Sequence, residues 1–380
     1  MKTRFLFLII ALLITLPILS QTRLEATVTD FQTGEALPFA SIYRQGKLTT
    51  LANIQGAFVL DAAPDDTLRV TYIGYKTLNI VASKLPAVVK LHPSTQYLPE
   101  LVVQPVYDRM KSIIRATEKA VRRHQEAKSI FFYRQSTYID GTQRNMMEAF
   151  FDARSALTAS SIRLITGRIA ENGDVIYGAD LYRLSQIRIL EKDGIKVFDD
   201  ETIVPLDRHF RNYYETSLTT MDDNGRKLYE ITFETNDTTR RRHIVTGTLY
   251  VDAEHLLPVK MKGEIENLTL FNRSIEGSID GEELPVRVTF DVTYDLGCRF
   301  PEVSSVVVGA TYRDNNHDYT FNSVLYNTGI NKLDTKGTPE YIYDLRKQIR
   351  QRRFNRDFWN RHETIKRTDI EKLLNESQLP

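Results

Sequence analysis

Short apolar segments alternate with turn residues along most of the chain. At the start of this pattern, Leu24, Ala26 and Val28 are separated by polar residues, and this period of two predicts a half-buried β-strand. Further strands are predicted up to residue 92, at Phe39–Tyr43, Ala57–Leu60, Leu68–Ile73, Thr77–Val81 and Ala87–Leu91. Such short, closely spaced strands leave no room for crossover helices. We therefore expect a small β-sandwich with antiparallel sheets over residues 22–92.

Glycines mark the predicted turns of this sandwich. Gly34, Gly56 and Gly74 each lie between two strand segments, and Gly34 is expected to supply a positive φ. The stretch TDFQTGEALPFASIY around Gly34 could be a ligand loop or a corner of the sandwich. We favour the corner, because its aromatic residue Phe39 and the later Phe58 fit the filling of a sandwich.

Three motifs in this region occur in the order TDFQTGEALPFASIY, NIQGAFVL and LRVTYIGYKT. Together they resemble the carboxypeptidase-regulatory-like (transthyretin-like) β-sandwich family. The sequence departs from the family pattern at Thr49–Leu51, where a G-T-x-T-N run is usual. The resemblance implies a packing or adhesion module without peptidase chemistry.

The rest of the chain is also predicted to be mainly β. Residues 93–106 contain three prolines and form a predicted linker, and Tyr107–Ala127 has the apolar spacing of an amphipathic helix. Strands follow at 131–139, 145–153, 161–169, 227–235, 241–251, 256–266, 284–295, 304–313 and 319–326, with hairpin turns at Asn224–Gly225 and Ala253–His255. Residues 107–340 thus predict a helix with a larger curved antiparallel sheet, either open or a half-barrel. Residues 341–380 predict a basic C-terminal helical segment.

The segments FFYRQSTY, MMEAFFDA and RDFWNRHETIKRTDIEKLL resemble the C-terminal half of exported Gram-negative proteins that join such a sandwich to a curved sheet. The hairpin GTLYVD–LLPVK is similar to those of periplasmic lipoprotein-carrier half-barrels. The element LPELVV resembles the segment after the same sandwich in TonB-dependent outer-membrane receptors. The chain beyond Pro105 is too short for the plug and barrel of such a receptor.

The first twenty residues have the layout of a secretory signal peptide. Lys2 and Arg4 precede the apolar run Phe5–Leu19, and the small residue Ser20 follows it. An uncleaved membrane anchor is the alternative, although the run is short for a bilayer and contains a proline. We therefore expect an exported protein of the periplasm or the outer-membrane surface, in the cell envelope.

Charge and composition limit the classes of molecule that this protein is expected to bind. A net charge of +1 gives no overall field for nucleic acid, and one cysteine, Cys298, allows no intrachain disulfide. Basic residues on the predicted helices at 107–127 and 341–358 could meet an anionic membrane surface or simply face solvent. The expected partners are a lipid or an outer-membrane protein, and no nucleic acid.

No catalytic motif is present. The seven histidines form no H-E-x-x-H or H-x-x-E pair, and neither a G-x-S-x-G elbow nor a phosphate-binding loop occurs. Carboxylates such as Glu148, Asp152 and Asp199–Glu201 could serve a hydrolase only if two of them face across a cleft. We therefore expect no metal and no cofactor.

Three functions remain open. The first is a non-catalytic cell-envelope protein that binds an apolar ligand or lipid in the curved sheet; the second is an accessory subunit that docks to an outer-membrane transporter or adhesin; the third is an envelope hydrolase. For the first, a cluster of aromatic residues is the candidate binding groove, although these residues could equally fill the core: Phe131, Phe132, Tyr133, Phe150 and Phe151.

Overall fold

The computed structural model describes the following residues: 21–94, 96–97, 106–124, 127–171, 182, 184–187, 189–190, 205–236, 244–269, 285–295, 300–314, 316–329, 339–340, 342, 344–352, 358–359 and 365–366. The predicted signal peptide, Asp199–Glu201 and Cys298 lie outside them. The chain divides into two compact units. The first comprises Met1–Tyr72 and Thr77–His92, and the second comprises Ile73–Lys76 and Pro93–Pro380.

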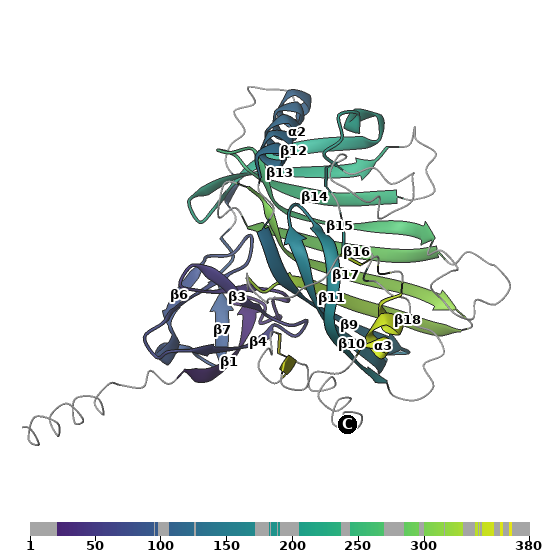
Figure 1. Ribbon diagram of the computed structural model, residues 1–380. Helices are drawn as coiled ribbons and strands as arrows, with labels where there is room; N and C mark the ends of the chain where they lie inside the picture. The colour runs from purple at the N-terminus through teal and green to yellow at the C-terminus, as the bar shows by residue number, and fades with distance from the viewer. Residues whose placement is uncertain are drawn as a thin grey trace, which may run out of the picture. The chain divides into compact units, whose positions relative to one another are not determined.

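The first unit contains seven strands in two sheets (Figure 1). One sheet has the order β4-β1-β7 and the other β3-β2-β5-β6. Their bounds are β1 Thr22–Asp30, β2 Ser41–Arg44, β3 Lys47–Leu51, β4 Ala57–Ala62, β5 Thr67–Thr71, β6 Leu78–Val81 and β7 Val88–Leu91, with the 3-10 turn η1 at Ala82–Lys84. Ile42 and Phe58 are fully buried, as expected for the filling of a sandwich, whereas Phe39, for which the same role was expected, is only partly buried and has a φ of +60°.

The strand pairing of this unit differs from the prediction in one place. Strand β1 pairs in parallel with β7, so the expectation of antiparallel pairing throughout is wrong. Because η1 carries the chain from β6 in one sheet to β7 in the other, β7 is not the hairpin partner of β6 and is free to run parallel to β1.

The turn glycines Gly34, Gly56 and Gly74 have φ values of +74°, +75° and +88°.

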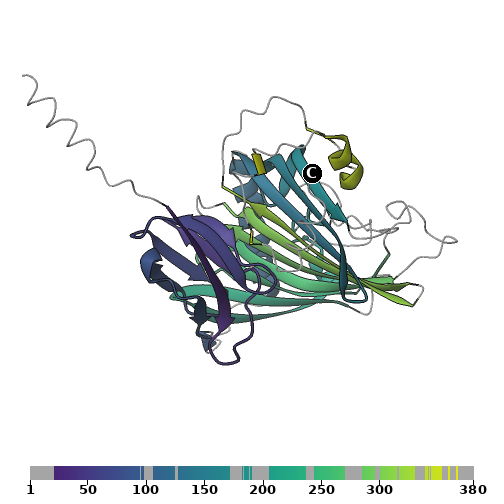
Figure 2. The same ribbon diagram turned by 90° about the horizontal axis from the view of Figure 1, so that it is seen from below.

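Eleven strands of the described second unit form one sheet, in the order β11-β10-β9-β18-β17-β16-β15-β14-β13-β12-β8. Every pairing in it is antiparallel. Their bounds are β8 Gln96–Tyr97, β9 Ala127–Ile139, β10 Thr142–Ser155, β11 Ala159–Glu171, β12 Tyr214–Asp223, β13 Arg226–Thr235, β14 Ile244–Asp252, β15 Leu257–Thr269, β16 Pro285–Asp295, β17 Glu302–Asp314 and β18 His317–Asn327. The helical elements are α2 Val106–Arg123, η2 Phe210–Asn212 and α3 Leu345–Gln351. The predicted fold class, mainly β with a large curved antiparallel sheet, is confirmed (Figure 2).

The alternation of residue types decides which face of this sheet is buried. On β16, Val288, Phe290 and Val292 belong to the large apolar core, and Arg287 and Asp291 between them point to the other face. Residues from β10 near one edge and from β13 near the other join the same core. The sheet therefore curves around this core, and the face that carries it is the concave face.

Helix α2 packs on the concave face with the predicted stripe. Met110, Ile113, Ile114 and Thr117 are buried, and the Thr117 hydroxyl donates to the carbonyl oxygen of Ile113 at 2.9 Å. The helix ends at Arg123, earlier than predicted. Its next residue, His124, stacks on Phe300 at 3.6 Å between ring centroids, which fixes the chain's exit from the helix toward β9.

A row of four residues crosses β13, β14, β15 and β16 on the concave face. Phe233 pairs with Gly247, Gly247 with Gly263, and Gly263 with Phe290. The two phenylalanine rings lie over the glycines, because a Cβ on Gly247 would meet Phe233 Cζ at 2.5 Å and one on Gly263 would meet Phe290 Cζ at 2.8 Å. Glycine at these positions admits both rings and allows the sheet to bend there.

Candidate functional site

The concave face carries the main hydrophobic core of the described second unit. Its core takes side chains from α2, α3 and ten of the eleven strands. Representative residues are Phe131 on β9, Ile231 on β13, Met261 on β15, Val306 on β17 and Leu325 on β18. These five side chains are at most 2% exposed. The face is thus continuous across the sheet and is closed from solvent in this structure.

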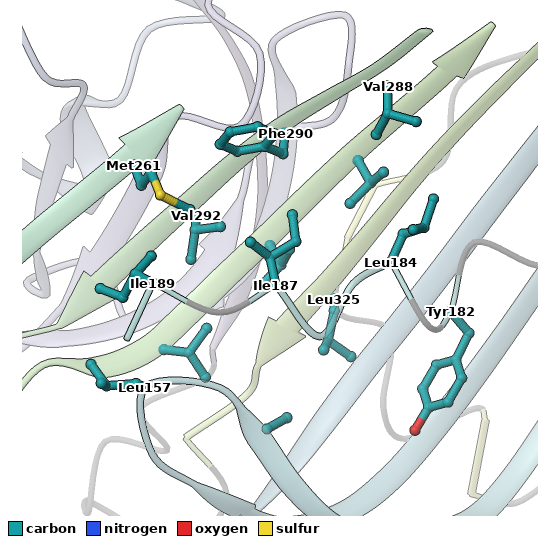
Figure 3. Packing of buried hydrophobic residues seen from close by; sticks show 14 of the residues in the cluster. Leu157, Tyr182, Leu184, Ile187, Ile189, Met261, Val288, Phe290, Val292 and Leu325 are labelled. Carbon is teal, nitrogen blue, oxygen red and sulfur yellow. The ribbon is translucent and has the colours of Figure 1, made fainter. Parts of the chain in front are cut away.

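Part of this closure comes from a segment that is neither helix nor strand. Tyr182, Leu184, Ile187, Ile189 and Leu190, together with Leu206, belong to the core and form what we call the covering segment. Figure 3 shows Ile187 and Ile189 lying over the strands that carry Val292 and Leu325. Within the segment, Ser185 N donates to Tyr182 O at 3.1 Å, and Leu206 N donates to Ile189 O at 2.9 Å beside an isolated bridge between Leu190 and Leu206.

The structure divides the five predicted aromatic residues between two faces of the sheet. Phe131, Tyr133 and Phe151 lie on the concave face and belong to its core. Tyr182 of the covering segment packs on two of them, at 5.8 Å from Tyr133 and 5.0 Å from Phe151 between ring centroids. Three of the five candidates therefore share one surface with the covering segment.

Phe132 and Phe150 lie together on the opposite, convex face. They are paired across β9 and β10, with ring centroids 5.0 Å apart. Phe358 and Trp359, from the C-terminal part of the chain, pack edge-on against Phe150 at 4.9 and 5.0 Å. Both residues are thus covered by the chain itself, on the side of the sheet away from the other three.

The convex face of β9, β10 and β11 also holds a buried ionic cluster. Glu148 is fully buried and accepts from Arg134 Nε at 2.8 Å and from Arg168 Nε at 2.5 Å, both cross-strand neighbours. Burial would raise the pKa of the Glu148 carboxyl, but the two guanidinium charges outweigh it and hold this pKa below its usual range.

The same cluster anchors the C-terminal part of the chain. Arg134 Nη2 donates to the carbonyl oxygen of Ile365 at 2.8 Å, and the Arg168 guanidinium lies 4.0 Å from the centroid of the Trp359 ring. Trp359 Nε1 also donates to Thr166 Oγ1 at 3.3 Å. Glu148 therefore organises a structural contact, and its charge is balanced by arginine.

The other carboxylate considered from sequence, Asp152, is also paired with an arginine. Its Oδ2 lies 3.3 Å from Arg163 Nη2. Within the described residues, no group of three or more His, Cys, Asp or Glu side chains is arranged to hold a metal ion. The same part of the chain contains no helix with the length and apolarity needed to cross a bilayer.

The basic residues of the two predicted helices have different environments. On α2, Arg115, Lys119 and Arg123 are exposed on the side away from the core. On α3, Arg346 and Arg350 donate to the carboxylate of Glu171 at the edge strand β11, at 2.6 and 2.9 Å. The basic character of α3 therefore serves its attachment to the sheet, whereas that of α2 faces outward.

One family model matches the N-terminal part of the chain. Residues 24–103 match the model of the CarboxypepD_reg-like domain family. This match confirms the resemblance predicted for the N-terminal region from its three motifs. The curated proteins include none that matches the chain.

Three solved structures show a distant similarity to the chain. A LolA superfamily protein of Nitrosomonas europaea is 10% identical, covers 59% of this chain and 98% of its own, and has a TM-score of 0.22. The MucA/MucB complex of Pseudomonas aeruginosa is 11% identical, with coverages of 57% and 93% and a TM-score of 0.20. A DUF1329 family protein of Desulfovibrio piger is 7% identical, with coverages of 58% and 95% and a TM-score of 0.22. TM-scores this low define no shared fold, so the second unit is described by its own geometry.

Proposed function

We propose that this chain is a non-catalytic, exported cell-envelope protein that binds an apolar ligand, such as the acyl chain of a lipid, on the concave face of its large sheet. Export is the expectation from the pattern of residues 1–20. The first unit, as a carboxypeptidase-regulatory-like sandwich, would serve packing or adhesion.

One observation carries the proposal: the apolar concave face is closed in part by the covering segment. Strands hold each other through ladders of backbone hydrogen bonds, whereas Ile187 and Ile189 meet the sheet through side chains. Elements of this kind belong to the low-stability end of a fold and open at modest free-energy cost. An acyl chain that replaces these side chains would keep the strands' apolar surface out of water, so exchange costs little hydrophobic free energy.

The ionic cluster on the convex face supports a non-catalytic role. A carboxylate that acts as a general acid or base needs a pKa near the operating pH. Glu148 has a lowered pKa and two arginine partners, which suit a permanent charge in a structural contact.

Native mass spectrometry of the protein purified from envelope extracts tests the proposal. We expect a bound species of lipid mass at about one per chain, released by organic extraction as acyl-containing material. The matched comparison is the variant Val292→Asp, which places a carboxylate on the concave face, against Thr293→Asp, its neighbour on the other face of β16. Lipid should be lost from folded Val292→Asp and kept by Thr293→Asp. Ligand-free protein from several expression hosts would contradict the proposal.

A further inference from the structure

Several buried polar side chains lie on the mainly apolar concave face, and two of them are close together near the end of β9. Thr137 and Asn145 are directly opposite each other on β9 and β10, and both are 0% exposed. Thr137 is in register with Phe321 of the core on its other side. Thr137 follows Phe131 and Tyr133 at even spacing, and Asn145 precedes Met147 and Ala149 in the same way, so both side chains belong to the concave face.

Each of these side chains has a buried polar atom without a hydrogen-bond partner among the described residues. These atoms are Thr137 Oγ1 and Asn145 Oδ1. A buried polar atom that makes no hydrogen bond costs about 1–3 kcal/mol, so native proteins rarely retain one without a use. Two of them side by side on a mainly apolar surface indicate a place where a polar group of another molecule is received.

The orientation of Asn145 defines what that group must offer. Its amide nitrogen donates to Glu171 Oε1 at 3.3 Å, and an ionised carboxylate can only accept. The amide oxygen of Asn145 therefore points away from Glu171 as an acceptor, and its partner must be a donor. The Thr137 hydroxyl can either donate or accept. A hydroxyl or an amide N–H satisfies this pair, whereas a carboxylate or a phosphate diester has no proton to give to Asn145.

The pair is also connected to the rest of the concave face. Tyr133, which packs against Tyr182 of the covering segment, lies four residues before Thr137 on β9, or about 13 Å along the strand. Between them Gln135 accepts a hydrogen bond from the Tyr133 hydroxyl at 2.8 Å. A chain-like ligand beneath the covering segment can therefore reach the pair with one end.

From this arrangement we infer that Thr137 and Asn145 form a subsite for the uncharged, hydrogen-bond-donating head of an acyl ligand. The inference rests on the proposed function, because the concave face must first admit the acyl chain. It names the ligand class as neutral amphiphiles with a hydroxyl or amide N–H, in preference to free fatty acids or to esters that carry no such donor.

The test compares four probes of equal chain length at pH 7 by isothermal titration: monopalmitoylglycerol, palmitamide, methyl palmitate and palmitate. The first two carry an uncharged donor, the third has none and the fourth is ionised. We expect the first two to bind about tenfold more tightly than the other two, which corresponds to one well-made hydrogen bond to a buried group.

The informative variant is Thr137→Val, which keeps the side-chain shape and removes the partnerless hydroxyl. We expect the preference for monopalmitoylglycerol over methyl palmitate to fall severalfold, with an unchanged or higher melting temperature. The control is Thr158→Val in the β10–β11 turn, since Thr158 Oγ1 is also buried without a partner among the described residues but lies at the other end of β10. That variant should keep the wild-type preference.

The outcomes separate the two proposals. Equal binding of all four probes would overturn the subsite and leave the proposed function standing. A lower melting temperature of Thr137→Val with an unchanged preference would also overturn it, since the hydroxyl would then serve the fold through an internal water. Failure of every probe to bind would reject the proposed function and the subsite with it.

Discussion

Glu148 places a negative charge inside the protein between two arginines. Replacing it by glutamine leaves the buried Arg134 and the partly buried Arg168 without a balancing charge. We therefore expect Glu148→Gln to lower the free energy of unfolding at pH 7 by about 3–5 kcal/mol, measured by urea denaturation. The control is Glu264→Gln, which removes a surface pair with Arg287 and should cost less than about 1 kcal/mol. Equal losses from both variants would contradict the role of the buried cluster.

The pH dependence of stability gives a second test of the same residue. The pKa of Glu148 is lower in the folded protein than the unfolded value of about 4.3. A carboxyl with a depressed folded pKa contributes stability above the unfolded pKa, and this contribution is lost as the pH falls through the folded pKa. Wild type should therefore lose stability more steeply than Glu148→Gln below about pH 4. Parallel pH profiles of the two proteins would show that Glu148 does not titrate as the structure implies.

The five candidate aromatic residues show what the sequence could and could not predict at this scale. Adjacent residues on a strand point to opposite faces, so the run Phe131–Tyr133 already predicts a division between two surfaces. Its register opposite Phe150 and Phe151 follows only from the pairing of β9 and β10. The cover over Phe150 comes from Trp359, more than 200 residues away along the chain, and no local pattern predicts that contact.

The row of Phe233, Gly247, Gly263 and Phe290 across β13 to β16 explains why glycine is needed where the sheet bends. A Cβ on Gly263 would meet the carbonyl oxygen of Thr246 and the Cα of Gly247, and backbone atoms cannot move aside cheaply. We expect Gly263→Ala to lower the free energy of unfolding by about 1–3 kcal/mol. Its control is Gly309→Ala, where the nearest atom is the side-chain hydroxyl of Thr289 at 2.6 Å, which can rotate away. Thermal denaturation of both variants measures the difference, and a larger loss in Gly309→Ala would contradict this explanation.

The strands that were not predicted from the sequence have weak apolar periodicity. Strand β12 carries Leu218 and Met221 among polar residues, and β3 is five residues long with two threonines. Both are strands because of their neighbours: β12 pairs along its whole length with β13, and β3 pairs with β2. Directly after the end of α2, His124 likewise makes a contact that is remote in sequence, the stacking on Phe300.

At the scale of the second unit, the sheet order depends on contacts that are remote in sequence. Strand β18 lies between β9 and β17, so its pairing with β9 joins residues about 190 positions apart. The sequence predicted a curved antiparallel sheet, because hairpins join most neighbouring strands. It could not predict that the covering segment closes part of the concave face, since the burial of its side chains depends on the finished sheet.

The central claim is that an acyl chain enters the concave face beneath the covering segment. The chain's one tryptophan, Trp359, lies on the convex face, so wild type serves as its own control. A reporter on the concave face is obtained by combining Tyr182→Trp with Trp359→Phe, because Tyr182 packs against Tyr133 and Phe151. The direct measurement is quenching of tryptophan fluorescence by a lipid with a brominated acyl chain, titrated into each protein. We predict saturable quenching of the reporter at about one lipid per chain, with little quenching of Trp359 in wild type. An unquenched reporter, or equal quenching of both proteins, would contradict this account.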